Sequence, residues 1–172
     1  AGNISRDRGW YDDAVKEFQA AIVLDPSDSW SYAYLAYSLI YAGKAAEGET
    51  QIATAMRLDP HFPSLFDFYL GLAQFEQNRM EEAAITLEKA VRLNPDDPWP
   101  FLFLAASRAH LGREKEGLEA IAAFNSARVK GGGVPVVMGE LKGYHDLTPF
   151  VPPPGSPLLG GLHRLRMPDD FD

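Results

Sequence analysis

Residues Arg92–Trp99 read RLNPDDPW, in which two prolines enclose two aspartates between apolar runs. Similar stretches occur earlier: VLDPSDSW at Val23–Trp30 and RLDPHFPS at Arg57–Ser64. The shared prolines, 34 and 35 residues apart, are Pro26, Pro60 and Pro95. Proline ends a helix because it has no backbone N–H and clashes with the preceding turn. A stop signal at a near-constant interval predicts a repeat architecture, whereas an ordinary helical bundle has no reason to repeat its loops at a fixed period.

Other positions fall into register when the three prolines are aligned. Small residues follow the leucines of one column, which are Leu35, Leu70 and Leu104. A second apolar column contains Phe18, Ile52, Leu87 and Ile121. A turn column contains Gly9, Gly43, Asn78 and Gly112, residue types that adopt the left-handed conformation which ends a helix. Apolar residues between the turns recur at helical spacing, so the predicted unit is helix, tight turn, helix, tight turn.

These columns resemble the tetratricopeptide repeat (TPR) family over about residues 9–127. The matching stretches are GWYDDAVKEFQAAIVLDPSD, GKAAEGETQIATAMRLDP, NRMEEAAITLEKAVRLNPDD and, less closely, GREKEGLEAIAAFNSA. The resemblance implies an all-α fold, an α-solenoid of about three and a half helix-turn-helix repeats. Residues 1–128 would form the array, with the second half of a repeat at 9–28 and repeats at 29–62, 63–97 and 98–128. The first of these second helices is expected at about residues 11–24, after a turn at Gly9.

Residues 129–172 are predicted to form a Pro/Gly-rich C-terminal extension with a short helix. Seven of the thirteen prolines of the chain lie in it, three of them in VPPPG. VPVVMGELKGY, residues 134–144, fits a short helix or a strand. SPLLGGLHRL, residues 156–165, fits a helix capped by Ser156 whose apolar face comprises Leu158, Leu159, Leu162 and Leu165. We expect the extension to pack on the repeats, with this helix at the end of the stack or the Pro-rich stretch along the concave side. A disordered arm is the alternative.

The same extension has a second resemblance. PF at residues 149–150, then LLGGL and MPDDF, is similar to the C-terminal end of some bacterial TPR regions attached to class III nucleotide cyclases and transcriptional regulators. The stretches VPPPGSP and HRLRM depart from that pattern. This resemblance implies a regulatory C-terminal segment of a larger signalling enzyme.

Composition and charge exclude several function classes. The net charge of −8, without a basic stripe, disfavours nucleic-acid binding. No apolar run is long enough for a membrane span. Cysteine is absent, and the four histidines do not share a helix face at metal-ligand spacing. We therefore predict no enzymatic activity, no cofactor and no metal. AGNISRDRGW at the start does not read as a signal peptide, which favours the cytoplasm and leaves the periplasm open.

The family alignment implies a partner-binding groove on the first helices of the repeats. Its lining would be apolar and aromatic, and comprises Trp30, Ala33, Tyr37, Tyr41, Phe68, Leu72, Phe75, Trp99, Leu102 and His110. The Lys, Arg and Asn residues with which TPR proteins clamp chaperone carboxylates are missing from it. The sequence thus predicts a protein–protein interaction scaffold that binds a peptide or helix in this groove. The alternatives are the regulatory segment described above and a structural module that self-associates as a homo-oligomer through its incomplete N-terminal repeat. Glu76 is expected on the surface.

Overall fold

The computed structural model describes residues 2–136 and 155–165, with side chains from residue 10 onward. Within these residues the secondary structure is helical. The helices are α1 (Gly2–Leu24), α2 (Ser29–Tyr41), α3 (Ala45–Leu58), α4 (Ser64–Glu76), α5 (Met80–Leu93), α6 (Pro98–His110), α7 (Glu114–Lys130) and α8 (Leu158–Arg164). The α-solenoid predicted from the sequence is confirmed.

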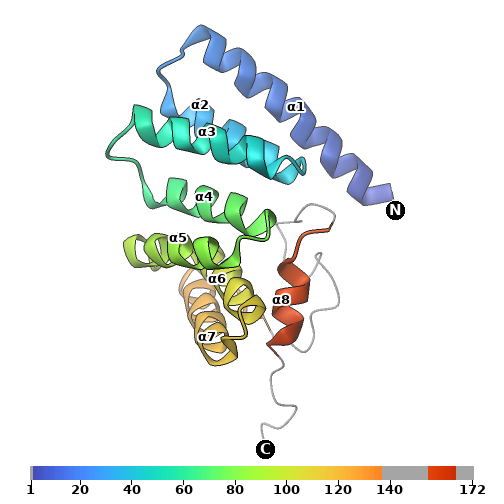
Figure 1. Ribbon diagram of the computed structural model, residues 1–172, viewed down its shortest axis with the longest axis vertical. Coiled ribbons are helices and arrows are strands. Elements are labelled where there is room, and N and C mark those ends of the chain that lie inside the picture. The colour runs from blue at the N-terminus through green and yellow to red at the C-terminus, as the bar shows by residue number, and fades with distance from the viewer. Residues whose placement is uncertain (1, 137–154, 166–172) are drawn as a thin grey trace, which may run out of the picture.

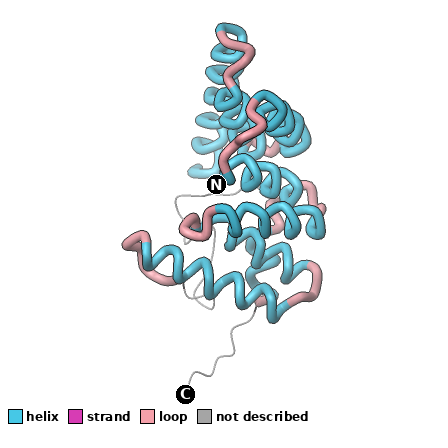
Figure 2. The backbone as a smooth tube through the Cα atoms, turned by 90° about the vertical axis from the view of Figure 1, so that its left-hand side faces the viewer, coloured by secondary structure: helices cyan, strands magenta, loops and turns pink. Residues whose placement is uncertain are grey.

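Consecutive helices pack as pairs, and the pairs stack along one direction (Figure 1). The pairs are α2–α3, α4–α5 and α6–α7, and α1 packs on α2. The loops that join the helices lie at the edges of the stack (Figure 2). Each pair contacts its neighbours in the sequence, as expected for a repeat array whose stability comes from nearest-neighbour interfaces.

Three members of the turn column have the left-handed conformation that was predicted. The φ angles of Gly43, Asn78 and Gly112 are 82°, 61° and 73°. Asn is the non-glycine residue that enters this region most readily, because its short polar side chain tolerates it. After each of these turns a backbone N–H closes the end of the first helix; that of Arg79, for example, donates to the Gln74 carbonyl at 3.0 Å.

The predicted turn at Gly9 is wrong, because Gly9 lies inside the continuous helix α1. The other first helices have 13 residues each, and only eight residues precede Gly9 in this chain. Residues 2–8 belong to the same helix as residues 11–24 and do not fold back on them, so a turn at Gly9 would bring no packing contact between these two stretches. Continuing the helix costs about 1 kcal/mol relative to alanine at this one position.

The two aspartates of RLNPDDPW have different roles. α5 ends before Pro95, and the Asp97 carboxylate caps α6 by accepting a hydrogen bond from the Trp99 N–H at 3.1 Å. Asp28 caps α2 in the same way, and Asp96 instead forms an exposed ion pair with Lys130. The stretch therefore stops one helix and starts the next.

Glycines in the small-residue columns allow the helices to approach closely. A Cβ added at Gly71 would lie 2.7 Å from Cγ of Leu87, on α5. A Cβ at Gly48 would lie 2.7 Å from Cγ1 of Ile40, on α2. Such distances are far below van der Waals contact, so these two positions need glycine where the two helices of a pair meet.

The predicted Leu-rich helix is confirmed as α8, which lies beside α6 (Figure 1). Leu158, Leu162 and Leu165 are buried in the main core, and Leu159 is partly buried against it. Ser156 accepts a hydrogen bond from the Leu158 N–H at 3.3 Å, as expected of a cap. The predictions for most of residues 134–144 and for the triple proline lie outside the described residues.

Candidate functional site

The ten predicted groove residues divide into two groups by burial. We call the surface of α2, α4 and α6 that carries their positions the inner face. Six residues are no more than 2% exposed: Ala33, Tyr41, Phe68, Leu72, Phe75 and Leu102. Neighbouring first helices meet through such side chains; the rings of Phe68 and Phe75, for example, lie 5.9 and 5.4 Å from that of Phe103. These six side chains form the core beneath the inner face and are not accessible to a partner.

The other four predicted residues, Trp30, Tyr37, Trp99 and His110, are partly exposed. Trp30 is 38% exposed, and its ring contacts those of Tyr34 at 5.6 Å and Phe66 at 5.3 Å. Tyr34 is 39% exposed and stacks on Phe18 of α1 at 5.5 Å. Trp30 and Tyr34 therefore form an exposed aromatic pair that packs on the buried ring of Phe66 and the partly buried ring of Phe18. The groove prediction missed Tyr34, although it lies one helical turn after Trp30 and so on the same side of α2.

A tyrosine cluster lies next to this pair. Tyr37 contacts Tyr41 at 4.7 Å and Tyr69 at 5.1 Å, and Tyr11 of α1 stacks on Tyr41 at 5.2 Å. Burial, together with the nearby tyrosines, raises the pKa of Tyr37 and of Tyr41 well above the usual value. Both hydroxyls therefore keep their protons at physiological pH, so this part of the inner face carries no tyrosinate charge.

At the other end of the inner face, α8 occupies the surface of α6. Gly161 faces Ala106: a Cβ added at Gly161 would lie 2.7 Å from the Ala106 carbonyl oxygen. The His110 Nε2–H donates to the Pro157 carbonyl oxygen at 2.8 Å. The Ser156 hydroxyl donates to Oε1 of Glu76, on α4, at 2.6 Å. A segment of the chain itself is thus bound on the inner face by close backbone packing and by side-chain hydrogen bonds.

Small residues on α6 make room for α8. In the repeat register Ala106 takes the place of Tyr37 and Leu72, and Ala109 takes the place of Ile40 and Phe75. Leu165, directly after α8, enters the space left at Ala109: its Cδ2 lies 2.6 Å from the Cβ position of Gly117, as Ile40 lies against Gly48. α8 therefore supplies apolar volume that the third repeat lacks.

Glu76 is not the ordinary surface residue that the sequence suggested, since its carboxyl group is partly buried under α8. Burial raises the pKa of Glu76 to about 7, and the hydrogen bond from Ser156 opposes the rise. Near neutral pH the group is therefore divided between a neutral and a charged form. The prediction failed because exposure was inferred from the repeat alone, without the segment that covers it.

Neither a metal-ligand cluster nor a helix that could span a membrane occurs in the described part of the chain. Residues 2–136 and 155–165 contain no cluster of three or more His, Asp or Glu side chains that could hold a metal ion. None of the described helices is both long and apolar enough to cross a bilayer.

Comparison with known proteins agrees with this architecture. Residues 35–98 match the family model for the tetratricopeptide repeat. A TPR repeat-containing protein of Treponema pallidum (strain Nichols) is 28% identical over 120 residues, which are 70% of this chain and only 15% of that protein. MamA superposes with a TM-score of 0.61 at 20% identity, covering 74% of each chain. YrrB, whose structure is titled a TPR protein with an unusual peptide-binding site, superposes with a TM-score of 0.56 at 20% identity, covering 73% of this chain and 64% of its own.

The two structural likenesses concern the fold alone, and the two sequence matches concern the repeats themselves. The period of 34 to 35 residues, the left-handed turns and the family match over residues 35–98 all agree. These findings support the tetratricopeptide repeat family, whose model matches residues 35–98 of this chain.

Proposed function

We propose that this protein is an interaction scaffold whose inner face binds a short helical segment of a partner protein. TPR arrays generally act as protein-interaction scaffolds, and the finer assignment rests on one observation. Residues 156–165, which include the seven-residue helix α8, already lie on the inner face, with three buried leucines and hydrogen bonds to Glu76 and His110. A surface that holds a segment of its own chain in this way has the shape and chemistry to hold a similar one from a partner.

The uncovered part of the inner face supports the same proposal. Trp30 and Tyr34 present exposed rings whose positions are fixed by Phe18 and Phe66, so little side-chain freedom is lost on binding. Large aromatic side chains contribute a disproportionate share of interface energy. The ten predicted positions include no Lys or Arg, so the partner is recognised by apolar side chains rather than by a carboxylate. The peptide-binding site named for YrrB supports the choice of a peptide partner.

The experiment selects peptides of about 15 residues from a random displayed library on the wild-type chain and measures their affinity for two variants. Trp30→Ala removes an exposed anchor and should weaken binding roughly 30-fold, the effect of about 2 kcal/mol. Ile85→Ala is the control: Ile85 is 62% exposed on α5 and lies outside the inner face. Equal affinities of the selected peptides for wild type and Trp30→Ala would reject the inner face as the binding surface.

A further inference from the structure

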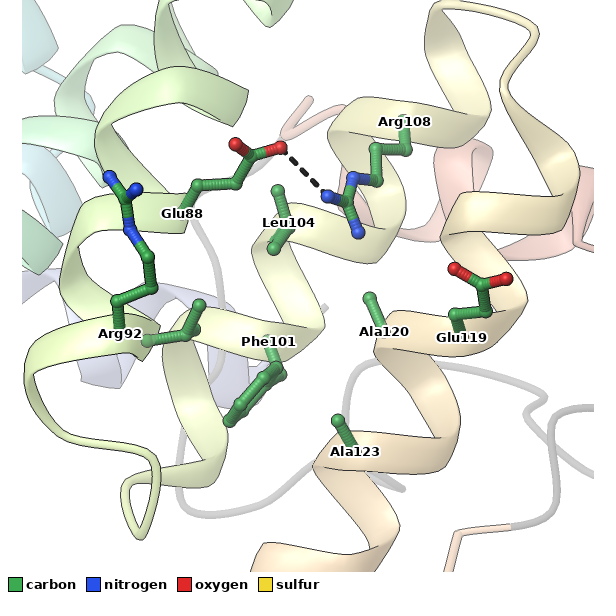
Figure 3. A pocket seen from close by; sticks show the side chains of 9 residues that line it. Glu88, Arg92, Phe101, Leu104, Arg108, Glu119, Ala120 and Ala123 are labelled. Carbon is green, nitrogen blue, oxygen red and sulfur yellow. Dashed lines mark hydrogen bonds and ion pairs between the residues drawn. The ribbon is translucent and has the colours of Figure 1, made fainter.

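A pocket of about 310 Å³ lies between α5, α6 and α7, on the other side of α6 from α8. Figure 3 shows the residues that line it, which are Glu88, Val91, Arg92, Phe101, Leu104, Arg108, Glu119, Ala120 and Ala123. Its volume is near the lower end of the roughly 300–1,000 Å³ found for small-molecule sites. It is thus large enough for one bulky apolar group and lies outside the inner face.

The repeat register explains why this pocket is open in the last repeat. Ala123 occupies the position held one repeat earlier by Lys89, and Phe101 occupies that of Asp67. In the earlier repeat the Lys89 ammonium donates to Oδ1 of Asp67 at 2.9 Å and lies 5.0 Å from the centre of the Phe62 ring. There, the long lysine side chain reaches from α5 to α4. In the last repeat both polar partners are replaced by apolar residues, so the corresponding space is unfilled and apolar.

Two acidic and two basic side chains line the pocket, and two of them, Arg92 and Glu119, form no ion pair within the described residues; they lie on opposite sides of it (Figure 3). Arg108 is held by Glu88 at 2.7 Å, the pair joined by a dashed line in Figure 3, and it also donates to the Glu116 carbonyl oxygen at 3.2 Å. Arg92 also lines the pocket and has no ion pair with any residue in the described ranges. An exposed guanidinium beside an apolar floor favours a ligand that joins a carboxylate to an apolar group.

We propose that the α5–α7 pocket is a second binding site, which receives a bulky apolar side chain flanked by an acidic residue from a partner protein. The apolar side chain enters between Phe101, Leu104 and Ala123. This space corresponds to the one that the Lys89 side chain fills one repeat earlier. The neighbouring carboxylate pairs with Arg92. Two partner segments can then bind the same chain at once, one on each side of α6.

The test uses 4-phenylbutyrate as the probe, since it joins a phenyl ring to a carboxylate, and the whole chain labelled with ¹⁵N. Titration should shift the amide signals of the residues that line the pocket. Ala123→Met fills the pocket and should abolish these shifts. Ala122→Met, on the exposed neighbouring position of α7, adds the same side chain outside the pocket and should leave them unchanged.

A second part of the experiment tests whether binding requires the negative charge of the ligand. Arg92→Gln should weaken the binding of 4-phenylbutyrate about fivefold, the upper end for an exposed ion pair, and should leave the binding of 4-phenylbutan-1-ol unchanged. Arg57→Gln, at the same register position one repeat earlier, is the matched control and should change neither. Absence of shifts in the pocket, equal binding to Ala123→Met, or equal binding of acid and alcohol to wild type would each overturn the proposal.

Discussion

Leu87 shows at the scale of one residue what holds the stack together. Its side chain is fully buried and lies against Gly71, so it fills the interface between α4 and α5. We predict that Leu87→Ala lowers the free energy of unfolding by about 2–5 kcal/mol, through lost burial and a cavity that the rigid helix pair cannot close. Ile85→Ala, an exposed aliphatic residue of the same helix, should cost less than about 0.5 kcal/mol. Urea denaturation measures both, and similar midpoints for the two variants would contradict the repeat register.

Glu76 gives a prediction about pH. Its pKa is about 7 in the folded chain and near the usual 4.5 when unfolded, so the folded state binds more protons between these values. Stability must then fall as the pH rises from about 4.5 to 7. Glu76→Gln can still accept the Ser156 hydrogen bond but stays neutral. Relative to this variant, wild type should lose roughly 1–3 kcal/mol of stability between pH 5 and 8. Parallel pH profiles would show that burial of the carboxylate has no energetic cost.

The same two residues show how far a sequence can predict a site. The burial of Leu87 follows from its column, because every repeat needs an apolar residue there. The environment of Glu76 does not, since it is created by Ser156, 80 residues further along the chain. Likewise, the repeat alignment predicts the side of the helix on which Phe68 and Phe75 lie. It does not predict that the neighbouring Phe103 ring packs against them. Positions fixed inside one repeat are predictable, and exposure that depends on another segment is not.

At the scale of single elements, α8 contains two adjacent glycines with different surroundings. A Cβ at Gly161 would meet the Ala106 backbone at 2.7 Å, whereas a Cβ at Gly160 would meet only His110 Cε1, at 3.8 Å. We predict that Gly160→Ala stabilises the docked helix by up to about 1 kcal/mol, through helix propensity. Gly161→Ala should undock it despite the same gain in propensity. Hydrogen exchange of residues 158–165 measures the difference, and equal protection in the two variants would contradict the close contact with α6.

α1 is the element whose boundaries the sequence predicted wrongly. Gly9 fits the turn column, but residues 2–8 and 11–24 continue one helix and do not pack against each other. α1 packs chiefly on α2 and exposes Trp10, Val23 and Leu24 by 69, 80 and 87%. Self-association through α1 therefore remains a prediction. Sedimentation of wild type against Trp10→Asp tests it: a monomer at every concentration in both chains would reject it.

At the scale of the whole molecule, the array is a series of neighbour interfaces and should not be equally stable along its length. α4 and α5 have packed helices on both sides, and α1 lies at one end. We predict that amides of α1 exchange with solvent faster than those of α4 and α5, because a helix with a neighbour on only one side opens locally at a lower free-energy cost. Uniform protection from α1 to α7 in native-state hydrogen exchange would indicate a single cooperative unit instead.

The central claim is that the inner face binds a helical segment, and that α8 occupies part of it. A synthetic peptide of residues 155–165, titrated calorimetrically into the whole chain, tests this most directly. In wild type the tethered α8 is present at an effective concentration in the millimolar range and should exclude the peptide. In Gly161→Ala the site is vacated, and the peptide should bind saturably; adding Ala106→Leu should then remove that binding. The account is contradicted if the peptide binds neither the wild-type chain nor Gly161→Ala.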